Sequence, residues 1–218
     1  MKIKNYLKKR LFLYHIYMKY KDRLRSKPLK LIGEGIIAFR LKRNIGLDNI
    51  MSIGKGCWAD KLKISIHGNN NSISIGDKVK FKFDCELFIR GNNCSIEIGD
   101  GTSFSSGLRI MAVEDNSYVK IGKECMFSNQ IMVRTDDSHY IYDIQTGERI
   151  NKAKPIVVGD HVWIAAGVTI LKGTIIGKGS VIGTKSLVTH DISENCIAAG
   201  IPAKVVRENV VWSSQEKE

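Results

Sequence analysis

The segment RTDDSHYIYD, residues 134–143, gathers the side chains of this chain that are best suited to moving a proton. His139 carries an imidazole, whose ordinary pKa near neutrality lets it remove the proton of a hydroxyl group while that group attacks a substrate. Asp137, two residues earlier, is a candidate to orient the ring and hold its tautomer, and it is equally suited to a turn. Arg134 and Asp143 are candidate contacts to the molecule that carries the hydroxyl. The segment therefore predicts general-base chemistry centred on His139.

The residues that follow this segment show a strict period of six. The structure that this period predicts must position the segment. A branched aliphatic residue recurs at every sixth position, and a small residue follows four places after each of the first five. The aliphatic residues are Val158, Ile164, Ile170, Ile176, Ile182 and Val188, and the small ones are Val162, Val168, Thr174, Ser180 and Ser186. Neither a helix nor an isolated strand requires this period. A triangular β-solenoid does, because each flat side takes six residues and each aliphatic residue stacks on its copy in the next coil.

A second period, of 23 residues, precedes the first. The segments KISIHGNNNSISIG, ELFIRGNNCSIEIG and RIMAVEDNSYVKIG begin at residues 63, 86 and 109. Each reads as a strand, a turn rich in Asn or Asp, and a second strand that ends in Ile-Gly. Asn tolerates left-handed backbone angles, and Gly has no Cβ atom to clash in such turns. We therefore predict one solenoid over residues 46–198, with five extra residues at a corner of its earlier coils.

The solenoid pattern is interrupted at residues 139–157. Within this insertion, YIYDI and ERIN flank Thr146-Gly147, which predicts a protruding hairpin. Solenoid proteins often place function in such excursions, because their coils are mostly scaffold. Residues 199–218 leave the repeat and are expected to form a return segment and a tail.

The net charge of +12 is concentrated at the N-terminus, where residues 1–30 contain eleven Lys or Arg and one acid, Asp22. The rest of the chain is nearly neutral, which argues against a nucleic-acid partner. Residues 1–45 are predicted to form a basic helical segment. It is suited to capping the open end of the solenoid, to contacting an anionic membrane peripherally through residues 1–30, or to binding a partner. Its apolar run is too short to span a membrane, and no signal-peptide cleavage site is apparent.

The cysteines and histidines give no metal or disulfide pattern. Five scattered cysteines without CxxC spacing (Cys57, Cys85, Cys94, Cys125, Cys196) favour a reducing cytoplasm, and Cys57 and Cys125 fall at small inward positions of the repeat. His139, His161 and His190 occupy different places in their hexads, so we predict that no metal is bound.

Three further residues of the solenoid are candidates for binding. Trp163 takes an outward place in its hexad and should pack against a ligand or a second subunit. Ala166 and Thr184 are eighteen residues apart, so they should stack at one edge of successive coils, about 4.8 Å apart like neighbouring strands. Their small side chains allow a ligand to approach the backbone closely.

Three segments carry a resemblance to a known family: residues 134–143, GDHVWIAAGV at 159–168 and AGIPAKVVR at 199–207. Together they resemble the hexapeptide-repeat acyltransferases, and most of all the O-acetyltransferases of bacterial capsular or lipopolysaccharide sugars, sialic-acid O-acetyltransferases among them. The resemblance implies a left-handed parallel β-helix and a homotrimer. It also implies acetyl-CoA as co-substrate and the hydroxyl of a surface polysaccharide, or of its precursor, as acceptor.

The resemblance also implies roles for individual residues. His139 would be the general base of a direct transfer, and Trp163 a wall of the reaction site. The remaining residues would meet coenzyme A: Ala166 and Thr184 its pantetheine arm, and Thr189, Lys204 and Arg207 its nucleotide end. The chain departs from the family pattern at Ala165, Lys172 and His190. His190 stands where the family commonly has a Lys, and Lys185 or Lys204 is suited to supply the phosphate contact instead.

The same sequence features are compatible with other functions. An N-acetyltransferase of an amino sugar, or a serine acetyltransferase, would use the same base and cofactor groove. A zinc carbonic anhydrase-like protein would require histidines at matched corners of two subunits, and a scaffold without activity would not require His139, Trp163 or Lys204.

Overall fold

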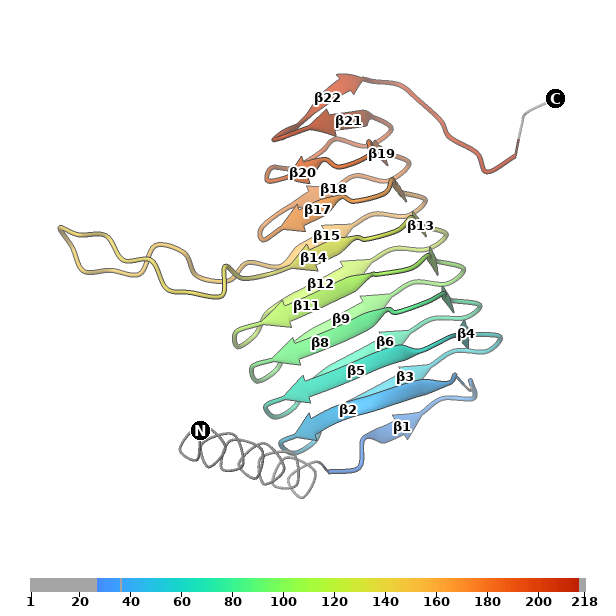
Figure 1. Ribbon diagram of the computed structural model, residues 1–218, viewed down its shortest axis with the longest axis vertical. Helices are drawn as coiled ribbons and strands as arrows, with labels where there is room; N and C mark the ends of the chain where they lie inside the picture. The colour runs from blue at the N-terminus through green and yellow to red at the C-terminus, as the bar shows by residue number, and fades with distance from the viewer. Residues whose placement is uncertain (1–26, 36, 216–218) are drawn as a thin grey trace, which may run out of the picture.

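The chain winds into a column of stacked parallel strands in the computed structural model, which describes residues 27–35 and 37–215 (Figure 1). This confirms the predicted all-β solenoid. Residues 1–26, which carry most of the predicted basic helix and its membrane contact, lie outside the described residues. Within the described part, no helix has the length and apolar character needed to cross a membrane.

Three sheets form the sides of the column, and from β3 to β20 the chain visits them in the order A, C, B in each coil. Sheet A contains β1 (Lys30–Ile32), β3 (Ile50–Ile53), β6 (Ser72–Ile75), β9 (Ser95–Ile98), β12 (Tyr118–Ile121), β15 (Ile156–Val158) and β18 (Ile175–Ile176). Sheet B contains β2 (Phe39–Ile45), β5 (Leu62–His67), β8 (Glu86–Arg90), β11 (Arg109–Val113), β14 (Met132–Arg134), β17 (Thr169–Leu171) and β20 (Leu187–Val188). Sheet C contains β4 (Trp58–Ala59), β7 (Lys80–Phe81), β10 (Ser103–Phe104), β13 (Met126–Phe127), β16 (Trp163–Ile164), β19 (Val181–Ile182), β21 (Ile197–Gly200) and β22 (Ala203–Arg207). We name the corners AC, CB and BA after the two sheets that each one joins.

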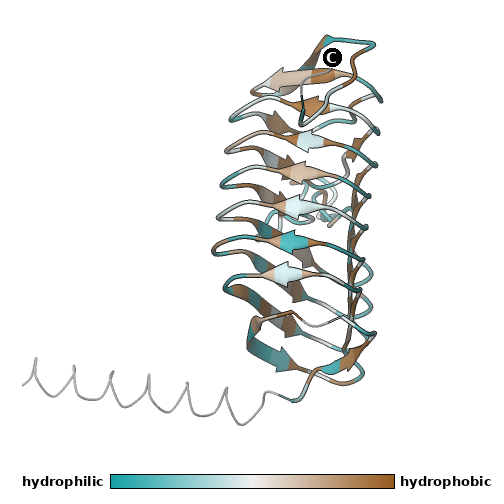
Figure 2. Cartoon of the chain, turned by 90° about the vertical axis from the view of Figure 1, so that its right-hand side faces the viewer, coloured by the Kyte–Doolittle hydropathy of each residue, from teal (hydrophilic) through white to brown (hydrophobic). Residues whose placement is uncertain are grey.

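The period of six corresponds to the interior of the column. All six aliphatic residues of the period are buried, as are the five small residues between them. Along β9 and β12, buried residues alternate with residues that are more exposed. Hydrophobic and hydrophilic stretches recur from coil to coil (Figure 2). Branched aliphatic side chains suit these positions because they fill a pleated surface and lose little rotamer freedom there.

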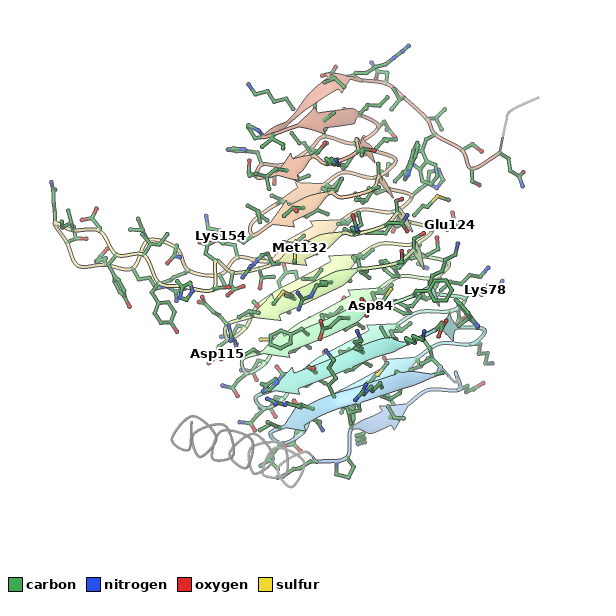
Figure 3. All side chains as sticks on the ribbon, viewed as in Figure 1. Lys78, Asp84, Asp115, Glu124, Met132 and Lys154 are labelled. Atoms are coloured by element: carbon green, nitrogen blue, oxygen red, sulfur yellow. The ribbon has the colours of Figure 1, made fainter. Side chains whose placement is uncertain are left out.

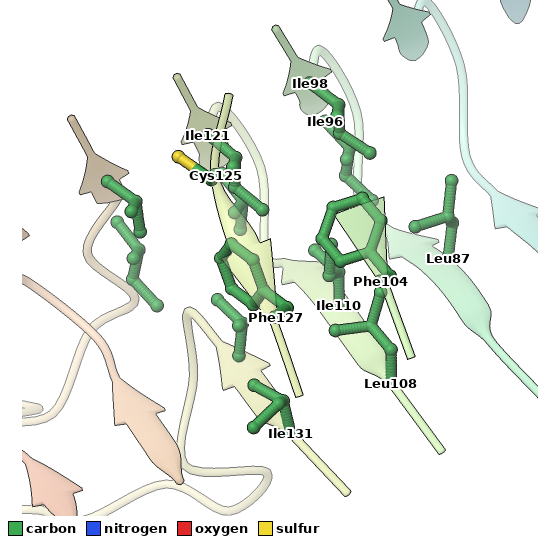
Figure 4. Packing of buried hydrophobic residues seen from close by; sticks show 14 of the residues in the cluster. Leu87, Ile96, Ile98, Phe104, Leu108, Ile110, Ile121, Cys125, Phe127 and Ile131 are labelled. Atoms are coloured by element: carbon green, nitrogen blue, oxygen red, sulfur yellow. The ribbon is translucent and has the colours of Figure 1, made fainter. Parts of the chain in front are cut away.

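Aromatic stacking strengthens the middle of the core. Phe81, Phe104 and Phe127 occupy the same position of sheet C in three successive coils, with ring centroids 4.9 Å and 5.0 Å apart. Phe104 and Phe127 lie among aliphatic residues of sheets A and B (Figure 4). Four of the five cysteines are also buried, whereas Cys57 is only partly so. Burial raises the pKa of both Cys85 and Cys125 to about 11, so these two residues are neutral packing groups.

The 23-residue period is a longer BA corner. Strand register pairs Lys63 with Glu86 and Glu86 with Arg109, and it gives the same offset of 23 in sheet A, where Ser95 pairs with Tyr118. In the later coils the offset falls to 18, as between Trp163 and Val181. The additional residues of the earlier coils lengthen the strands around the BA corner. There Asn70, Asn93 and Asn116 adopt positive φ angles of 56°, 55° and 62°, as expected of Asn in such turns.

Three predicted boundaries differ in the structure. The solenoid begins at Lys30 rather than at residue 46, because β1 and β2 already pair with the following coil. The insertion ends before Ile156, which belongs to β15, so the excursion between β14 and β15 covers residues 135–155. The solenoid ends in β21, at Gly200, and the predicted return segment is β22, which pairs antiparallel with β21.

Candidate active site

The insertion leaves the column at the BA corner and projects away from it (Figure 1). Its arms form the predicted hairpin, with an antiparallel bridge between Tyr142 and Arg149. His139 is exposed at the base of the insertion, and its backbone N–H donates to the Asp137 carbonyl at 2.8 Å. An open cavity of about 720 Å³ lies against this base, lined by His139, Tyr140 and Arg149 and, from the preceding coils, by Arg90 and Glu114. The candidate base therefore faces a space large enough for a sugar.

Arg134 holds the turn that leads to His139. Its guanidinium donates to the Asp136 backbone carbonyl and to the Asp136 carboxylate, both at 2.9 Å, and also to the Ser138 hydroxyl. Asp136 is 3% exposed and accepts the Ser138 N–H, at a turn where Ser138 has a φ of 67°. Arg134, expected from the sequence to contact the acceptor, thus also maintains the backbone conformation before His139.

Asp137 accepts hydrogen bonds from two neighbours. Its Oδ2 atom accepts from Lys172 Nζ at 2.5 Å and from Asn151 Nδ2 at 3.0 Å. Burial by itself would raise the pKa of the Asp137 carboxyl, but these hydrogen bonds and the charges of Lys172 and Arg134 lower it overall. Asp137 is therefore a carboxylate at neutral pH. Within the described residues, no hydrogen bond joins it to the His139 ring.

Asp143 lies at the far end of the insertion. Its Oδ1 atom accepts the backbone N–H groups of Gln145 and Thr146 at 2.9 and 2.8 Å, and these hydrogen bonds lower the pKa of its carboxyl. This arrangement is an Asx turn that closes the hairpin. Its expected contact with the acceptor remains a prediction.

The coil before the insertion anchors it through Glu114. The Arg149 guanidinium donates to both oxygens of the Glu114 carboxylate, with the Nη1–Oε2 distance at 2.9 Å. The same guanidinium lies over the Tyr140 ring, 4.4 Å from its centroid. Lys154 and Asp115, labelled in Figure 3, mark where the insertion meets the column. The walls of the cavity are thus tied to the scaffold.

Trp163 lies on sheet C, in an aromatic cluster with Trp212 and His161. Its side chain is 39% exposed, and its ring centroid is 6.0 Å from that of Trp212. Trp212, which follows β22, stacks on His161 with centroids 4.1 Å apart and an interplanar angle of 6°. The Trp212 indole N–H also donates to the His161 carbonyl at 2.8 Å. The segment after β22 therefore returns to the AC corner and extends the aromatic surface of Trp163.

Ala166 and Thr184 stack at the CB corner, as predicted. Lys185 N–H donates to the Ala166 carbonyl at 2.8 Å, which joins the two coils at this edge. In the described part of the chain, the backbone N–H groups of Ala166 and Thr184 donate no hydrogen bond, so both are available to an acceptor atom of a ligand. Lys185 is exposed beside them. A small-residue edge with free N–H groups and a nearby cation fits a pantetheine arm and a phosphate.

The other residues expected to bind the cofactor are dispersed. Thr189 follows β20 at the BA corner, where its hydroxyl contacts His190 Nδ1 at 2.9 Å. Lys204 and Arg207 are exposed on β22, at the end of sheet C, and form no ion pair within the described residues.

Several residues of the site were not predicted from the sequence. Asn151 and Lys172 contact Asp137 across 14 and 35 positions of the chain, and Glu114 contacts Arg149 across 35. No sequence period links these pairs. Lys172 departs from the family pattern, and this departure was the one feature of the sequence that could have drawn attention to it.

The three histidines considered for a metal site belong to different segments. His139 lies in the insertion, His161 at the AC corner and His190 after β20. Residues 27–35 and 37–215 contain no group of three or more His, Cys, Asp or Glu side chains arranged to hold a metal ion.

Comparisons with known proteins identify relatives of this chain. Residues 155–190 match the model of the bacterial transferase hexapeptide family, described as six repeats. A polysialic acid O-acetyltransferase from Neisseria meningitidis is 36% identical over 176 residues, covering 77% of this chain and 77% of that protein. One from Escherichia coli O1:K1 is 46% identical over 87 residues, which are 40% of this chain and 28% of that protein.

A solved structure shares the fold. The crystal structure of the polySia-specific acetyltransferase NeuO superimposes with a TM-score of 0.66 at 30% identity, covering 88% of this chain and 90% of that one. The similarity therefore extends over the solenoid and is not limited to the hexapeptide repeats.

Proposed function

Since this chain belongs to the hexapeptide-repeat O-acetyltransferases, we propose that it transfers an acetyl group from acetyl-CoA to a hydroxyl of an anionic, sialic-acid-containing bacterial polysaccharide. The observation that carries the proposal is the position of His139 at the edge of an open cavity beside the insertion. The polysialic acid O-acetyltransferases that match the chain support the acceptor class.

His139 acts as the general base in this proposal. The imidazole takes the proton of the acceptor hydroxyl as its oxygen attacks the thioester carbonyl of acetyl-CoA, and coenzyme A leaves as the thiol. The acetyl group passes directly to the acceptor, without an acyl-enzyme. The Asp137 carboxylate orients the ring, and Trp163 forms a wall of the site. Arg134 and Asp143 contact the acceptor.

The Ala166 N–H stabilises the negative charge that develops on the thioester oxygen, because a fixed donor costs no reorganisation during the reaction. Thr184 and Lys185 continue this edge along the pantetheine arm. Thr189, Lys204 and Arg207 hold the nucleotide end of coenzyme A.

One side chain that lines the cavity is suited to an anionic acceptor. Arg90 lines the cavity, and within the described residues it forms no ion pair. Its neighbour Arg149 is already neutralised by Glu114. A guanidinium without a carboxylate partner is suited to pair with the carboxylate of a sialic acid unit.

The complete site lies between two subunits of a homotrimer in this proposal. His139 follows β14 at the BA corner, whereas Ala166 and Thr184 lie at the CB corner, on the other side of sheet B. The insertion also carries exposed apolar side chains, including Ile144 at 99% exposed. A second copy of the chain would cover such side chains and bring the two corners together. The enzyme would act in the cytoplasm, where acetyl-CoA is available.

Thiol release from acetyl-CoA, measured against polysialic acid, free sialic acid and a neutral polysaccharide, tests the proposal. We expect turnover with polysialic acid and a loss of about 100-fold or more in His139→Ala. Acetyl-CoA binding should be unaffected by this change. Turnover of similar size in His139→Ala would exclude the general-base role, and turnover only with the neutral polymer would exclude the acceptor class.

A further inference from the structure

The base of the insertion is held by residues from three successive coils. Glu114 follows β11 in the coil before it, and Lys172 follows β17 in the coil after it. Between them, Arg149 and Asn151 lie on the returning arm of the insertion. The segment that carries His139 is therefore fixed from both neighbouring coils.

Asn151 is the centre of this arrangement. It is 6% exposed, and its Nδ2 atom donates to the His139 carbonyl at 2.7 Å and to Asp137 Oδ2 at 3.0 Å. Its Oδ1 atom accepts the Ile141 N–H at 2.8 Å, and its backbone carbonyl accepts from Lys172 Nζ at 2.9 Å. One side chain thus fixes the two peptide groups that flank Tyr140.

Lys172 determines which oxygen of Asp137 is engaged. Its side chain is 17% exposed, and its ammonium group contacts Oδ2, the atom that Asn151 also contacts. Oδ1 accepts no hydrogen bond within the described part of the chain. A carboxylate held through one oxygen keeps the other available for the N–H of an imidazole.

We propose that Lys172 and Asn151 are positioning residues for the base, which hold Asp137 through Oδ2 and fix the His139 backbone so that Oδ1 meets the imidazole during catalysis. The inference rests on the proposed function, since it concerns how His139 is aligned. Alignment of this kind affects the rate of proton transfer more than the binding of substrates. It gives Lys172, a departure from the family pattern, a role in the site.

The test compares Lys172→Met with Lys172→Arg in the full-length protein. We expect kcat to fall about tenfold or more in Lys172→Met, with the KM for acetyl-CoA unchanged, because Lys172 contacts Asp137 and Asn151 and none of the residues that we assign to acetyl-CoA. Lys172→Arg retains the charge and a donor, so it should keep most of the activity. Lys152→Met, which removes an exposed charge from the same insertion, is the matched control and should behave like the native protein.

A double-variant cycle shows whether Lys172 acts through Asp137. In an Asp137→Asn background, Lys172→Met should cause little further loss, because residues that act as a unit are not additive. Asn151→Ala should lower kcat by a similar or larger factor. If Lys172→Met and Asn151→Ala both matched Lys152→Met while His139→Ala lost activity, the positioning role would be overturned and the base would stand. If His139→Ala also retained activity, both would be overturned.

Discussion

The carboxylates around His139 differ in what holds them. Asp136 is buried against Arg134 and shapes the turn, whereas Asp137 is shared by Lys172 and Asn151. Glu114 belongs to the preceding coil and anchors the insertion through Arg149. Each has its own partner, so removing one partner should disturb one part of the site.

The Glu114–Arg149 pair makes the stability of the chain depend on pH. The hydrogen bond from Arg149 lowers the pKa of Glu114 below its ordinary value of 4.5. A lowered pKa in the folded state stabilises the protein above the unfolded value, and this contribution is lost as the pH falls through the folded value. Glu114→Gln should therefore reduce the free energy of unfolding at pH 7, and the deficit should shrink below about pH 4.5.

Denaturant unfolding at several pH values would measure this difference. Glu148→Gln is a suitable control, because Glu148 lies in the same insertion, is exposed and forms no ion pair within the described residues. A deficit that stayed constant from pH 7 to pH 3 would show that the pair does not stabilise the fold through its charge.

Individual residues of the site were predicted unevenly. His139 was identified from its chemistry and its place where the repeat stops, and the structure puts it beside the cavity. Arg134 and Asp143 were predicted to contact the acceptor, which stays a prediction, and the structure shows that both also satisfy turns of their own segment. A sequence shows which side chains can form hydrogen bonds, but it does not show which nearby backbone groups take them first.

At the scale of elements, stacking between coils stabilises the column. Phe104 lies between Phe81 and Phe127 and is 1% exposed. Phe104→Ala should leave a cavity and lower the free energy of unfolding by about 3–5 kcal/mol. Phe83→Ala, at a position 54% exposed, should change it by about 0.5 kcal/mol or less.

Equilibrium unfolding of the two variants would check this prediction. Equal losses from both substitutions would mean that the aromatic stack contributes no more to stability than surface phenylalanines do.

The solenoid strands were predictable because their signal is periodic. Period six marks the buried positions from Val158 to Val188, and period 23 marks the longer corners before them. The first coil was missed because β2 has a burial pattern unlike the later strands, with several exposed basic residues. The stacking of Trp212 on His161 was also missed, because it joins residues 51 positions apart outside the repeat.

At the scale of the whole molecule, the two halves of the proposed site lie at different corners of the column. His139 lies at the BA corner, whereas the Ala166 edge lies at the CB corner, with sheet B between them. A solenoid is a rigid scaffold, since each coil is fixed by the next. The two corners of one chain therefore cannot approach each other without unwinding coils, and in the proposed site a second chain supplies one of them.

Complementation between two inactive variants tests this account most directly. One variant is His139→Ala, and the other is Ala166→Tyr, whose side chain would block the edge that we assign to acetyl-CoA. Co-expressed with different tags and purified as mixed oligomers, they should recover acetyl transfer to polysialic acid. Some interfaces would then combine an intact His139 with an intact Ala166 edge. Mixed oligomers as inactive as either variant alone would contradict a site shared between subunits.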